Sequence, residues 1–318
     1  MLDPDREAAP SHFSLKPSLL RDVLRHARPL GHNEDAETLN LGFGFLYYGL
    51  VRSLRPRHVL VIGSGFGFSV TCLGLGLKDN GAGRLTFVDP SFSVLKDGPL
   101  QTFGGTSQWD DPEQVSARFA RFGIDGIVTH HKLTSGDFFQ RYGLLKLPPI
   151  DFAFVDGNHA YEHVRRDFVN VLKTRKSDPH HVYVAISSTV EDGTLVHQLA
   201  HVLDYLAGSR LMPGLSKPLS FDLGIPVEHL EHPREFGHWL AFLQEKFHVE
   251  PDADDAIIGY LYGRGLLIEG EHIRNQDAVI LKTKSERILK FMSENSAEID
   301  AVICERKGYI GSRTRKDH

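Results

Sequence analysis

The amino-acid sequence predicts an α/β fold with a doubly wound, mostly parallel sheet. Between residues 56 and 207, five short apolar segments alternate with segments that have the periodicity of amphipathic helices. Strands that alternate with helices form parallel sheets through right-handed crossovers. Three of the apolar segments end in glycine or aspartate, at Gly63, Asp89 and Asp156. Ligands of such sheets bind at the carboxyl ends of the strands, so these residues are candidates for a site.

The composition suits a globular protein and argues against several other classes. Of the 318 residues, 41% are hydrophobic and 24% are charged, so the chain can bury a sizeable core. A net charge of −5 argues against a general attraction to nucleic acid or anionic membranes. No apolar run approaches the ~20 residues that span a bilayer. The two cysteines, Cys72 and Cys304, cannot form a disulfide framework. We therefore expect a cytoplasmic protein without nucleic-acid or membrane partners.

The first 55 residues predict a helical cap. Leucine and valine at helical spacing indicate a helix over about residues 14–28. Asp35 is a suitable N-cap for a second helix over about 36–54, which would end before Pro56. We assign residues 1–55 to an N-terminal cap.

Residues 56–207 predict the cofactor-binding core. Strands are expected at 58–62, 84–88, 127–131, 151–155 and 181–186. Helices are expected at about 67–78, 111–122, 136–142, 159–173 and 192–207. This topology gathers the segments 63–67, 136–137, 156–159 and 187–192, together with Asp89, around one crevice. A long loop over 97–112 contains Trp109, which would form either an aromatic wall over a ligand or a hydrophobic anchor.

The residues beyond 207 are expected to cover and complete the fold. Residues 208–260 are assigned to a lid or insertion, with a helix over about 236–247. The segments 263–271 and 277–283 predict an antiparallel hairpin at the sheet edge, within a unit over 261–290. Residues 291–318 are assigned to a C-terminal helix and tail.

A glycine-rich loop follows the first strand, with the sequence Gly63-Ser64-Gly65-Phe66-Gly67. Glycine permits a sharp turn and the close approach of a ligand, and the start of the next helix has free N–H groups. Asp89 ends the second strand, where a carboxylate can accept hydrogen bonds from both hydroxyls of a ribose. Loop and acid together predict a nucleoside site. A tight turn with a capping aspartate is the alternative interpretation.

The spacing of the glycines favours one class of nucleoside. A dinucleotide fingerprint requires G-x-G-x-x-G, whereas the loop reads G-x-G-x-G and is followed by Phe68. Together with the segments 87–89 and 150–167, this loop resembles the class I S-adenosylmethionine-dependent methyltransferases. The run Asp156-Gly-Asn-His159-Ala-Tyr-Glu162 is similar to the Asp-Gly-x-His-x-Tyr-Glu segment of a branch of small-molecule O-methyltransferases. The resemblance covers about residues 36–190.

The resemblance implies a Rossmann-like fold and transfer of a methyl group from S-adenosylmethionine to a small-molecule acceptor, at oxygen. The loop residues Gly63, Ser64, Gly65, Phe66 and Gly67 would face the methionine part of the cofactor. Asp89 would hold the ribose, and Gly136 and Asp137 would lie near the adenine. Asp156 would contact the cofactor at the methyl-transfer centre.

His159 is the second candidate catalytic residue. It follows Asp156 by three residues, and its imidazole could act as the general base on an acceptor hydroxyl because its unperturbed pKa is near neutral. The alternative is that it caps or packs the helix start. In metal-dependent members, the resemblance implies a divalent cation at Asp156. Ser187-Ser188 replaces the acidic pair expected after the fifth strand, which argues against this metal.

Two departures from the family pattern motivate a different function. Val61 stands where the family usually has an acidic residue that helps to hold the charged end of the cofactor. With Ser187-Ser188, it motivates a binding or regulatory protein that has the methyltransferase fold and has lost catalysis. An NAD-dependent oxidoreductase is the other alternative, and the absence of the third glycine speaks against it. The acceptor stays open, and a homodimer is compatible with the sequence.

Overall fold

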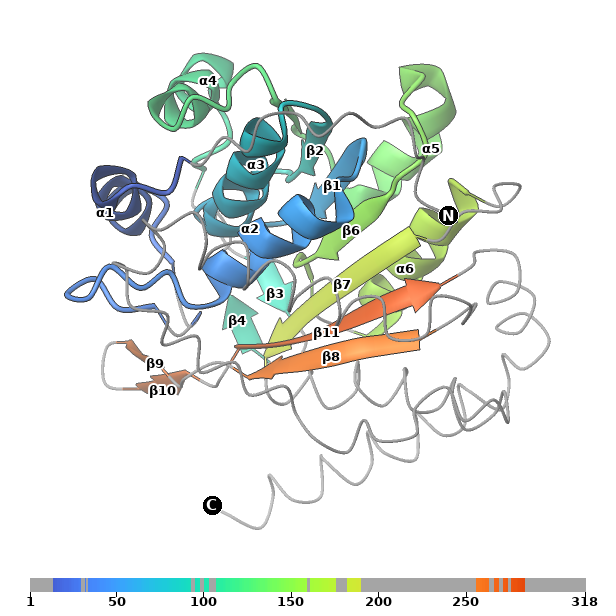
Figure 1. Ribbon diagram of the computed structural model, residues 1–318. Helices are drawn as coiled ribbons and strands as arrows, with labels where there is room; N and C mark the ends of the chain where they lie inside the picture. Colours follow the sequence, from blue (N-terminus) through green and yellow to red (C-terminus); the bar gives the residue numbers. More distant parts are fainter. Residues whose placement is uncertain are drawn as a thin grey trace, which may run out of the picture.

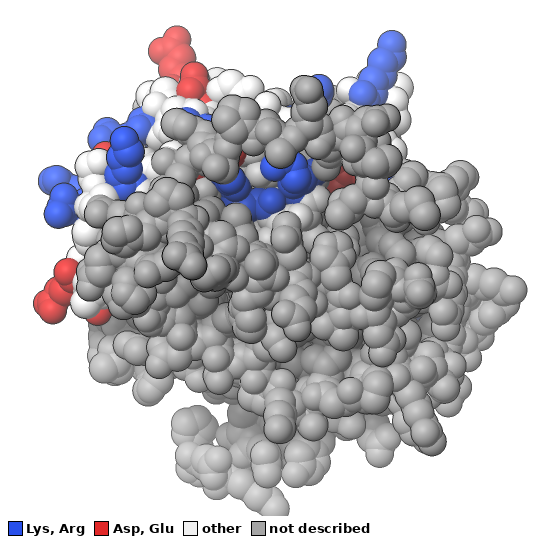
Figure 2. Space-filling model, viewed as in Figure 1, with Lys and Arg blue, Asp and Glu red and all other residues white. Residues whose placement is uncertain are grey.

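The computed structural model describes residues 14–29, 32, 34–92, 95–97, 100–102, 107–158, 161–175, 182–189, 256–262, 266–268, 271–273 and 276–283. Figure 1 shows a central sheet with helices on both of its faces. On the face shown in Figure 2, the described surface carries Lys and Arg side chains beside Asp and Glu side chains. Among the described helices, none is both long and apolar enough to cross a membrane.

The central sheet has seven strands in the order β5-β2-β1-β6-β7-β11-β8. Five adjacent strands run parallel, namely β1 (His58–Ile62), β2 (Arg84–Val88), β5 (Val128–His131), β6 (Phe152–Val155) and β7 (Val182–Thr189). The chain runs outward from β1 to β2 and β5 and then returns to the other side of β1 with β6. The α/β class and the doubly wound, mostly parallel sheet are therefore confirmed, with the switch point between β1 and β6.

The middle one of the five parallel strands, β1, is buried along its whole length. Val61 lies opposite Phe87 on β2 and Phe154 on β6, and all three belong to the hydrophobic core. A parallel strand that is covered on both faces has a continuous apolar sequence. This pattern is why the core strands can be located from sequence.

Four helices follow the strands as predicted: α3 (Phe68–Asn80), α4 (Pro112–Arg121), α5 (Ser135–Leu145) and α6 (Tyr161–Lys173). The starts of α4 and α5 are capped by side chains. Asp111 accepts hydrogen bonds from the N–H groups at the start of α4, and Thr134 does so at the start of α5. In Figure 1, α3 lies in front of the sheet together with α2 (Phe43–Leu54), and α6 lies behind it.

The N-terminal part differs from the prediction at its second helix. The first helix, α1 (Pro17–His26), forms within the predicted range, but α2 begins at Phe43 instead of residue 36. Asp35 Oδ1 accepts the N–H of Glu37, and a bridge between Asp35 and Asn40 closes a tight turn. The Asp35 carboxylate therefore stabilises a turn and does not cap a helix. The two roles exclude each other, because in each the carboxylate accepts from the backbone N–H groups of the next few residues.

A buried carboxylate connects the N-terminal segment to α3. Asp79 Oδ2 accepts hydrogen bonds from Tyr48 Oη at 2.5 Å and from the backbone N and Oγ of Ser14 at 2.8 and 2.9 Å. The Arg52 guanidinium lies 3.7 Å from the same oxygen. A buried charge is tolerated only when it is paired and hydrogen-bonded, so these donors stabilise the packing of α2 on α3.

The far edge of the sheet also differs from the prediction. β11 (Gln276–Thr283) runs antiparallel to β7, and β8 (Ala256–Tyr262) runs antiparallel to β11. β9 (Leu266–Ile268) instead pairs with β10 (Glu271–Ile273) in a separate small sheet. The predicted hairpin between 263–271 and 277–283 is therefore wrong in its partner. Several short segments here have strand-like sequences, and tertiary packing decides which of them pair.

The loop predicted over 97–112 contains structure of its own. β3 (Leu95–Asp97) pairs with β4 (Leu100–Thr102) in an antiparallel two-stranded sheet. The predicted helices over 192–207 and 236–247, the lid up to residue 255 and the C-terminal helix lie outside the described residues. The domain boundaries stay predictions.

Candidate functional site

The glycine loop begins at the switch point of the sheet, where β1 ends. Gly63 has a φ of +69°, a region that L-residues with side chains rarely adopt. A Cβ on Gly63 would lie 2.3 Å from the carbonyl oxygen of Asp156. The backbone N of Asp156 also donates to the carbonyl of Ile62 at 2.8 Å. The loops after β1 and β6 are therefore in backbone contact, and only glycine permits this approach.

The other two glycines of the loop are also left-handed, but their surroundings differ. Gly65 has a φ of +46°, and a Cβ there would meet no atom within 4 Å. Gly67 has a φ of +93°, and a Cβ there would lie 2.7 Å from Cη2 of Trp109. The loop is thus packed at Gly63 and Gly67 and faces open space at Gly65. A ligand can approach the backbone closely at that point.

Trp109 holds this loop in place from the loop after β2. Its side chain is buried, and its indole Nε1 donates a hydrogen bond to the carbonyl of Gly65. Its backbone N donates to Oγ of Ser91 at 3.0 Å, and its ring stacks on Phe119 with centroids 5.9 Å apart. Of the two roles predicted for Trp109, the structure shows the anchor.

Asp89 is buried at the end of β2, with only 7% of its surface exposed. Its Oδ1 accepts the N–H of Ser91 at 2.7 Å. The pKa of Asp89 is raised to about 6, mainly by burial and also by the nearby charge of Asp156, while hydrogen bonds from the backbone N–H groups of Ser91 and Ser64 act in the opposite direction. A buried carboxylate that is costly to ionise favours a ligand that donates hydrogen bonds to it.

His130 supports Asp89 from the neighbouring strand. It lies opposite Phe87 in the register of β2 and β5, and its Nε2 is 3.0 Å from the backbone oxygen of Asp89. Burial lowers the pKa of His130, so the ring is neutral, and with its hydrogen on Nε2 it donates to that oxygen. Sequence analysis did not identify this role. Strand register determines it, and no motif signals it.

Asp156 lies at the start of the loop after β6, within the electrostatic reach of Asp89 and of two buried N-terminal side chains, His32 and Tyr47. His32 Nδ1 is 3.1 Å from Oη of Tyr47, and the His32 ring packs on Phe68 at 4.8 Å. Burial lowers the pKa of His32 and raises the pKa of Tyr47, so both are neutral near pH 7. Sequence analysis missed both residues because only the fold brings the N-terminal segment to this site.

The remaining predicted site residues have the following places. Ser64 Oγ and Ser69 Oγ form a hydrogen bond of 2.6 Å. Asp137 is exposed at the start of α5, where Thr134 Oγ1 donates to its carboxylate at 2.7 Å and accepts its backbone N–H at 3.1 Å. Gly136 precedes it in the same turn, without close contacts that would require glycine. His159 lies outside the described residues.

Among the described residues, no three His, Cys, Asp or Glu side chains are grouped so that they could hold a metal ion. Glu191 and Asp192, two carboxylates that follow Ser187-Ser188 and could replace the acidic pair as cation ligands, lie outside that part of the chain.

The segment that holds these residues has a counterpart among known protein families. Residues 60–180 match the family model of a methyltransferase domain. This segment is similar to methyltransferase domains. It includes the whole glycine loop, Asp89 and Asp156, so the match covers the crevice described above. No curated protein matches the chain.

Three solved structures are similar at low identity. The O-methyltransferase TomG from Streptomyces achromogenes, in complex with S-adenosylmethionine, is 18% identical over 85% of this chain and 91% of its own, with a TM-score of 0.42. An O-methyltransferase from Bacillus cereus in complex with S-adenosylhomocysteine is 16% identical over 85% and 92%, with a TM-score of 0.45. A putative O-methyltransferase from Klebsiella pneumoniae is 17% identical over 83% and 89%, with a TM-score of 0.42.

Proposed function

We propose that this protein is a methyltransferase that uses S-adenosylmethionine to methylate a small-molecule acceptor at oxygen. One observation carries the proposal. Within the segment that matches methyltransferase domains, a loop of three left-handed glycines and a buried acid meet at the switch point of the sheet. When bound, the cofactor supplies an activated methyl group on its sulfonium. The protein aligns the acceptor with that methyl group and excludes water.

The residues of the crevice fit such a cofactor. The open space at Gly65 admits a ligand against the backbone, and we assign residues 63–67 to the methionine part. The Asp89 carboxylate is assigned to the two ribose hydroxyls, whose donated hydrogen bonds would offset the cost of burying its charge. Gly136 and Asp137, at the start of α5, are assigned to the adenine end.

We assign acceptor activation to Asp156 and His159. An acceptor hydroxyl must lose its proton as the new C–O bond forms, and a positioned imidazole can take that proton. Asp156 would orient the acceptor and the imidazole. The buried pair His32–Tyr47 lies within the electrostatic reach of Asp156, which supports our assignment of residues 1–55 as a cap. We assign residues 208–255 to a lid over the same crevice, since residues 256–260 belong to β8 of the central sheet.

Ligand binding separates this proposal from an oxidoreductase. We would titrate the purified chain with S-adenosylhomocysteine and, separately, with NADH by calorimetry, each with and without magnesium. S-adenosylhomocysteine alone should bind, and Asp89→Asn should weaken it by about tenfold or more. Asp125→Asn is the matched control, because Asp125 is an exposed acid before β5. Binding of NADH alone would refute the proposal. A magnesium effect would show that Asp156 has cation ligands other than an acidic pair.

Turnover separates an active enzyme from a binding protein with the same fold. Methyl-labelled S-adenosylmethionine would be incubated with the chain and a panel of hydroxyl-bearing acceptors. We expect Asp156→Asn and His159→Gln to lose transfer while each still binds S-adenosylhomocysteine. Cofactor binding with no transfer to any acceptor would instead favour the regulatory alternative. The fully buried Val61 would then be its first explanation, since it places no carboxylate at the end of β1.

A further inference from the structure

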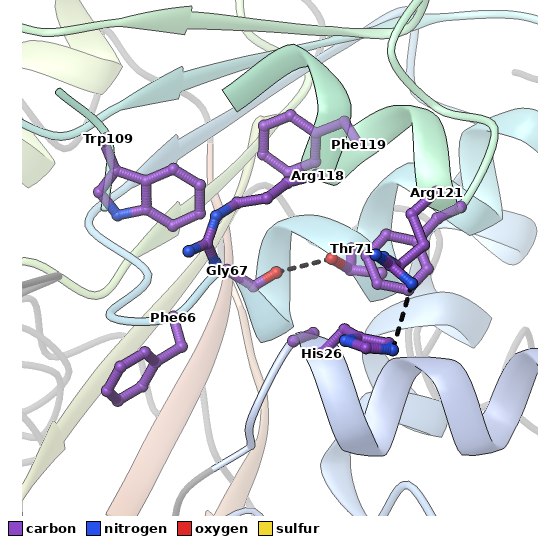
Figure 3. A pocket seen from close by; sticks show the side chains of 10 residues that line it. His26, Phe66, Gly67, Thr71, Trp109, Arg118, Phe119 and Arg121 are labelled. Carbon is purple, nitrogen blue, oxygen red and sulfur yellow. Dashed lines mark hydrogen bonds between the residues drawn. The ribbon is translucent and has the colours of Figure 1, made fainter. Parts of the chain in front are cut away.

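A second cleft lies on the outer side of the glycine loop, between the end of α1 and α4. We call it the arginine cleft, and it is lined by His26, Phe66, Gly67, Trp109, Arg118 and Arg121, among others. In Figure 3, Arg118 extends from α4 toward Gly67, between the rings of Trp109 and Phe66. Phe66 belongs to the glycine loop and Trp109 contacts that loop, and both side chains also line the arginine cleft.

Positive charge gathers in the arginine cleft. Arg118 and Arg121 come from α4, and Arg28 reaches its edge from the segment after α1. Within the described part of the chain, none of these three guanidinium groups forms an ion pair with a carboxylate, although several other arginines do. Burial and the like charge of Arg28 both lower the pKa of Arg118. The cleft therefore holds positive charge that no described acid compensates.

Two of these guanidinium groups are oriented by aromatic rings. Cζ of Arg28 lies 4.5 Å from the centroid of the Phe66 ring, and Cζ of Arg118 lies 5.4 Å from the centroid of a Trp109 ring. Stacking restricts a guanidinium plane while its N–H edge stays available to an oxyanion. Arg28 also has a φ of +45°, and such strained residues cluster at functional sites.

A hydrogen bond from Arg121 makes the imidazole of His26, which also lines the cleft, a hydrogen-bond acceptor. Arg121 Nη1 lies 3.2 Å from Nε2 of His26, and because arginine can only donate, Nε2 accepts (Figure 3). The N-terminal turn of α3 begins at Gly67, at the floor of the cleft, and its cap has no side-chain hydrogen bond. The positive end of this 13-residue helix adds to the field of the arginines.

We propose that the arginine cleft binds the phosphate group of a small anionic ligand. Guanidinium groups match phosphate oxygens with pairs of parallel hydrogen bonds. Two of them, from Arg118 and Arg121, line the cleft, and that of Arg28 lies over the ring of Phe66 at its edge. The site is separate from Asp89 and Asp156 and needs no cofactor. It stands whether or not the protein transfers methyl groups.

Calorimetry with inorganic phosphate tests this site in the full chain, with sodium chloride at equal ionic strength as the reference. Arg118→Gln should weaken phosphate binding by about tenfold or more, because it removes a charged donor. Arg141→Gln is the matched control, since Arg141 is exposed on α5 and does not line the cleft. Equal binding to wild type and Arg118→Gln, or heat that sodium chloride reproduces, would overturn the proposal.

Two further measurements keep the test decisive. Arg118→Lys retains the charge and should bind phosphate more weakly than wild type but more tightly than Arg118→Gln. If Arg118→Gln does not fold, the comparison of Arg118→Lys with wild type still tests the site. In a Trp239→Phe background, Trp109 is the sole tryptophan, and phosphate should change its fluorescence as Arg118 turns toward the anion. A separate titration with ribose 5-phosphate distinguishes a phosphate monoester from the free phosphate ion as the ligand. If malonate bound more tightly than both phosphate and ribose 5-phosphate, the assignment to phosphate would be overturned.

Discussion

The indole Nε1 of Trp109 donates a hydrogen bond to the carbonyl oxygen of Gly65, 3.1 Å away. This bond joins the loop after β2 to the loop after β1. The Trp109 ring also fills the space that a side chain at residue 67 would need. One buried aromatic residue therefore determines the shape of the loop that we assign to the cofactor.

Trp109→Phe should loosen the glycine loop. The substitution keeps a ring but removes the indole N–H that donates to the Gly65 carbonyl, so we expect a cost of about 1–3 kcal/mol in the free energy of unfolding and about tenfold weaker binding of S-adenosylhomocysteine. Urea unfolding and calorimetry measure the two effects. Phe119→Leu is the control, because it removes the stacked partner and keeps the hydrogen bond. Equal losses of affinity in both variants would contradict a specific role for the indole N–H.

Gly65→Ala and Gly81→Ala form a matched pair. Both glycines are left-handed, with φ of +46° and +67°, and a Cβ would meet no atom within 4 Å at either position. Each substitution should therefore cost a similar ~1 kcal/mol of stability, from the backbone conformation alone. Gly65→Ala should also weaken S-adenosylhomocysteine binding, because its methyl group enters the open space of the crevice. Unchanged affinity in Gly65→Ala would place the cofactor elsewhere.

The affinity for the cofactor should depend on the protonation of Asp89. Its pKa is raised to about 6, and only the charged form has two unprotonated oxygens, one to accept from each ribose hydroxyl. We expect the affinity for S-adenosylhomocysteine to be constant above pH 7 and to fall by up to tenfold for each pH unit below about 6. In Asp89→Asn this dependence should disappear. A wild-type affinity that is flat down to pH 5 would exclude Asp89 as the ribose ligand.

The same raised pKa predicts an opposite effect on the stability of the free protein. A carboxyl group with a higher pKa in the folded state stabilises the fold below pH 3.8, and this contribution is lost as the pH rises through about 6. Without ligand at pH 7.5, Asp89→Asn should therefore be more stable than wild type by about 1–2 kcal/mol, since it removes a buried charge. Urea unfolding at pH 4.5 and 7.5 should show this advantage growing with pH.

Tyr48→Phe should destabilise the contact between α2 and α3. Tyr48 Oη donates to the buried Asp79 at 2.5 Å, so its removal leaves a buried carboxylate with fewer donors, at a cost of about 1–3 kcal/mol. Burial and the charge of Asp79 both raise the pKa of Tyr48, so the hydroxyl remains a donor throughout the neutral range. Tyr183→Phe, at a half-buried ring beside the core, should cost less. Equal effects in urea unfolding would show that Asp79 does not depend on Tyr48.

The elements that sequence predicts well are those whose burial is uniform. β1, β2 and β6 are buried along nearly their whole length, and each is followed directly by glycine or aspartate. The predictions were wrong where two uses of the same residues compete. Asp35 suits either a helix cap or a turn, and residues 256–283 contain more strand-like segments than the sheet edge admits.

The sequence by itself determined the α/β class, the positions of the core strands along the chain and the placement of Gly63, Asp89 and Asp156 at strand ends, because local periodicity and turn chemistry specify them. Only the tertiary structure decided that Trp109 anchors the glycine loop, that His130 supports Asp89 and that Tyr47 approaches Asp156. These contacts join segments that are far apart in the chain. Strand register and helix packing bring them together, and neither leaves a local pattern in the sequence.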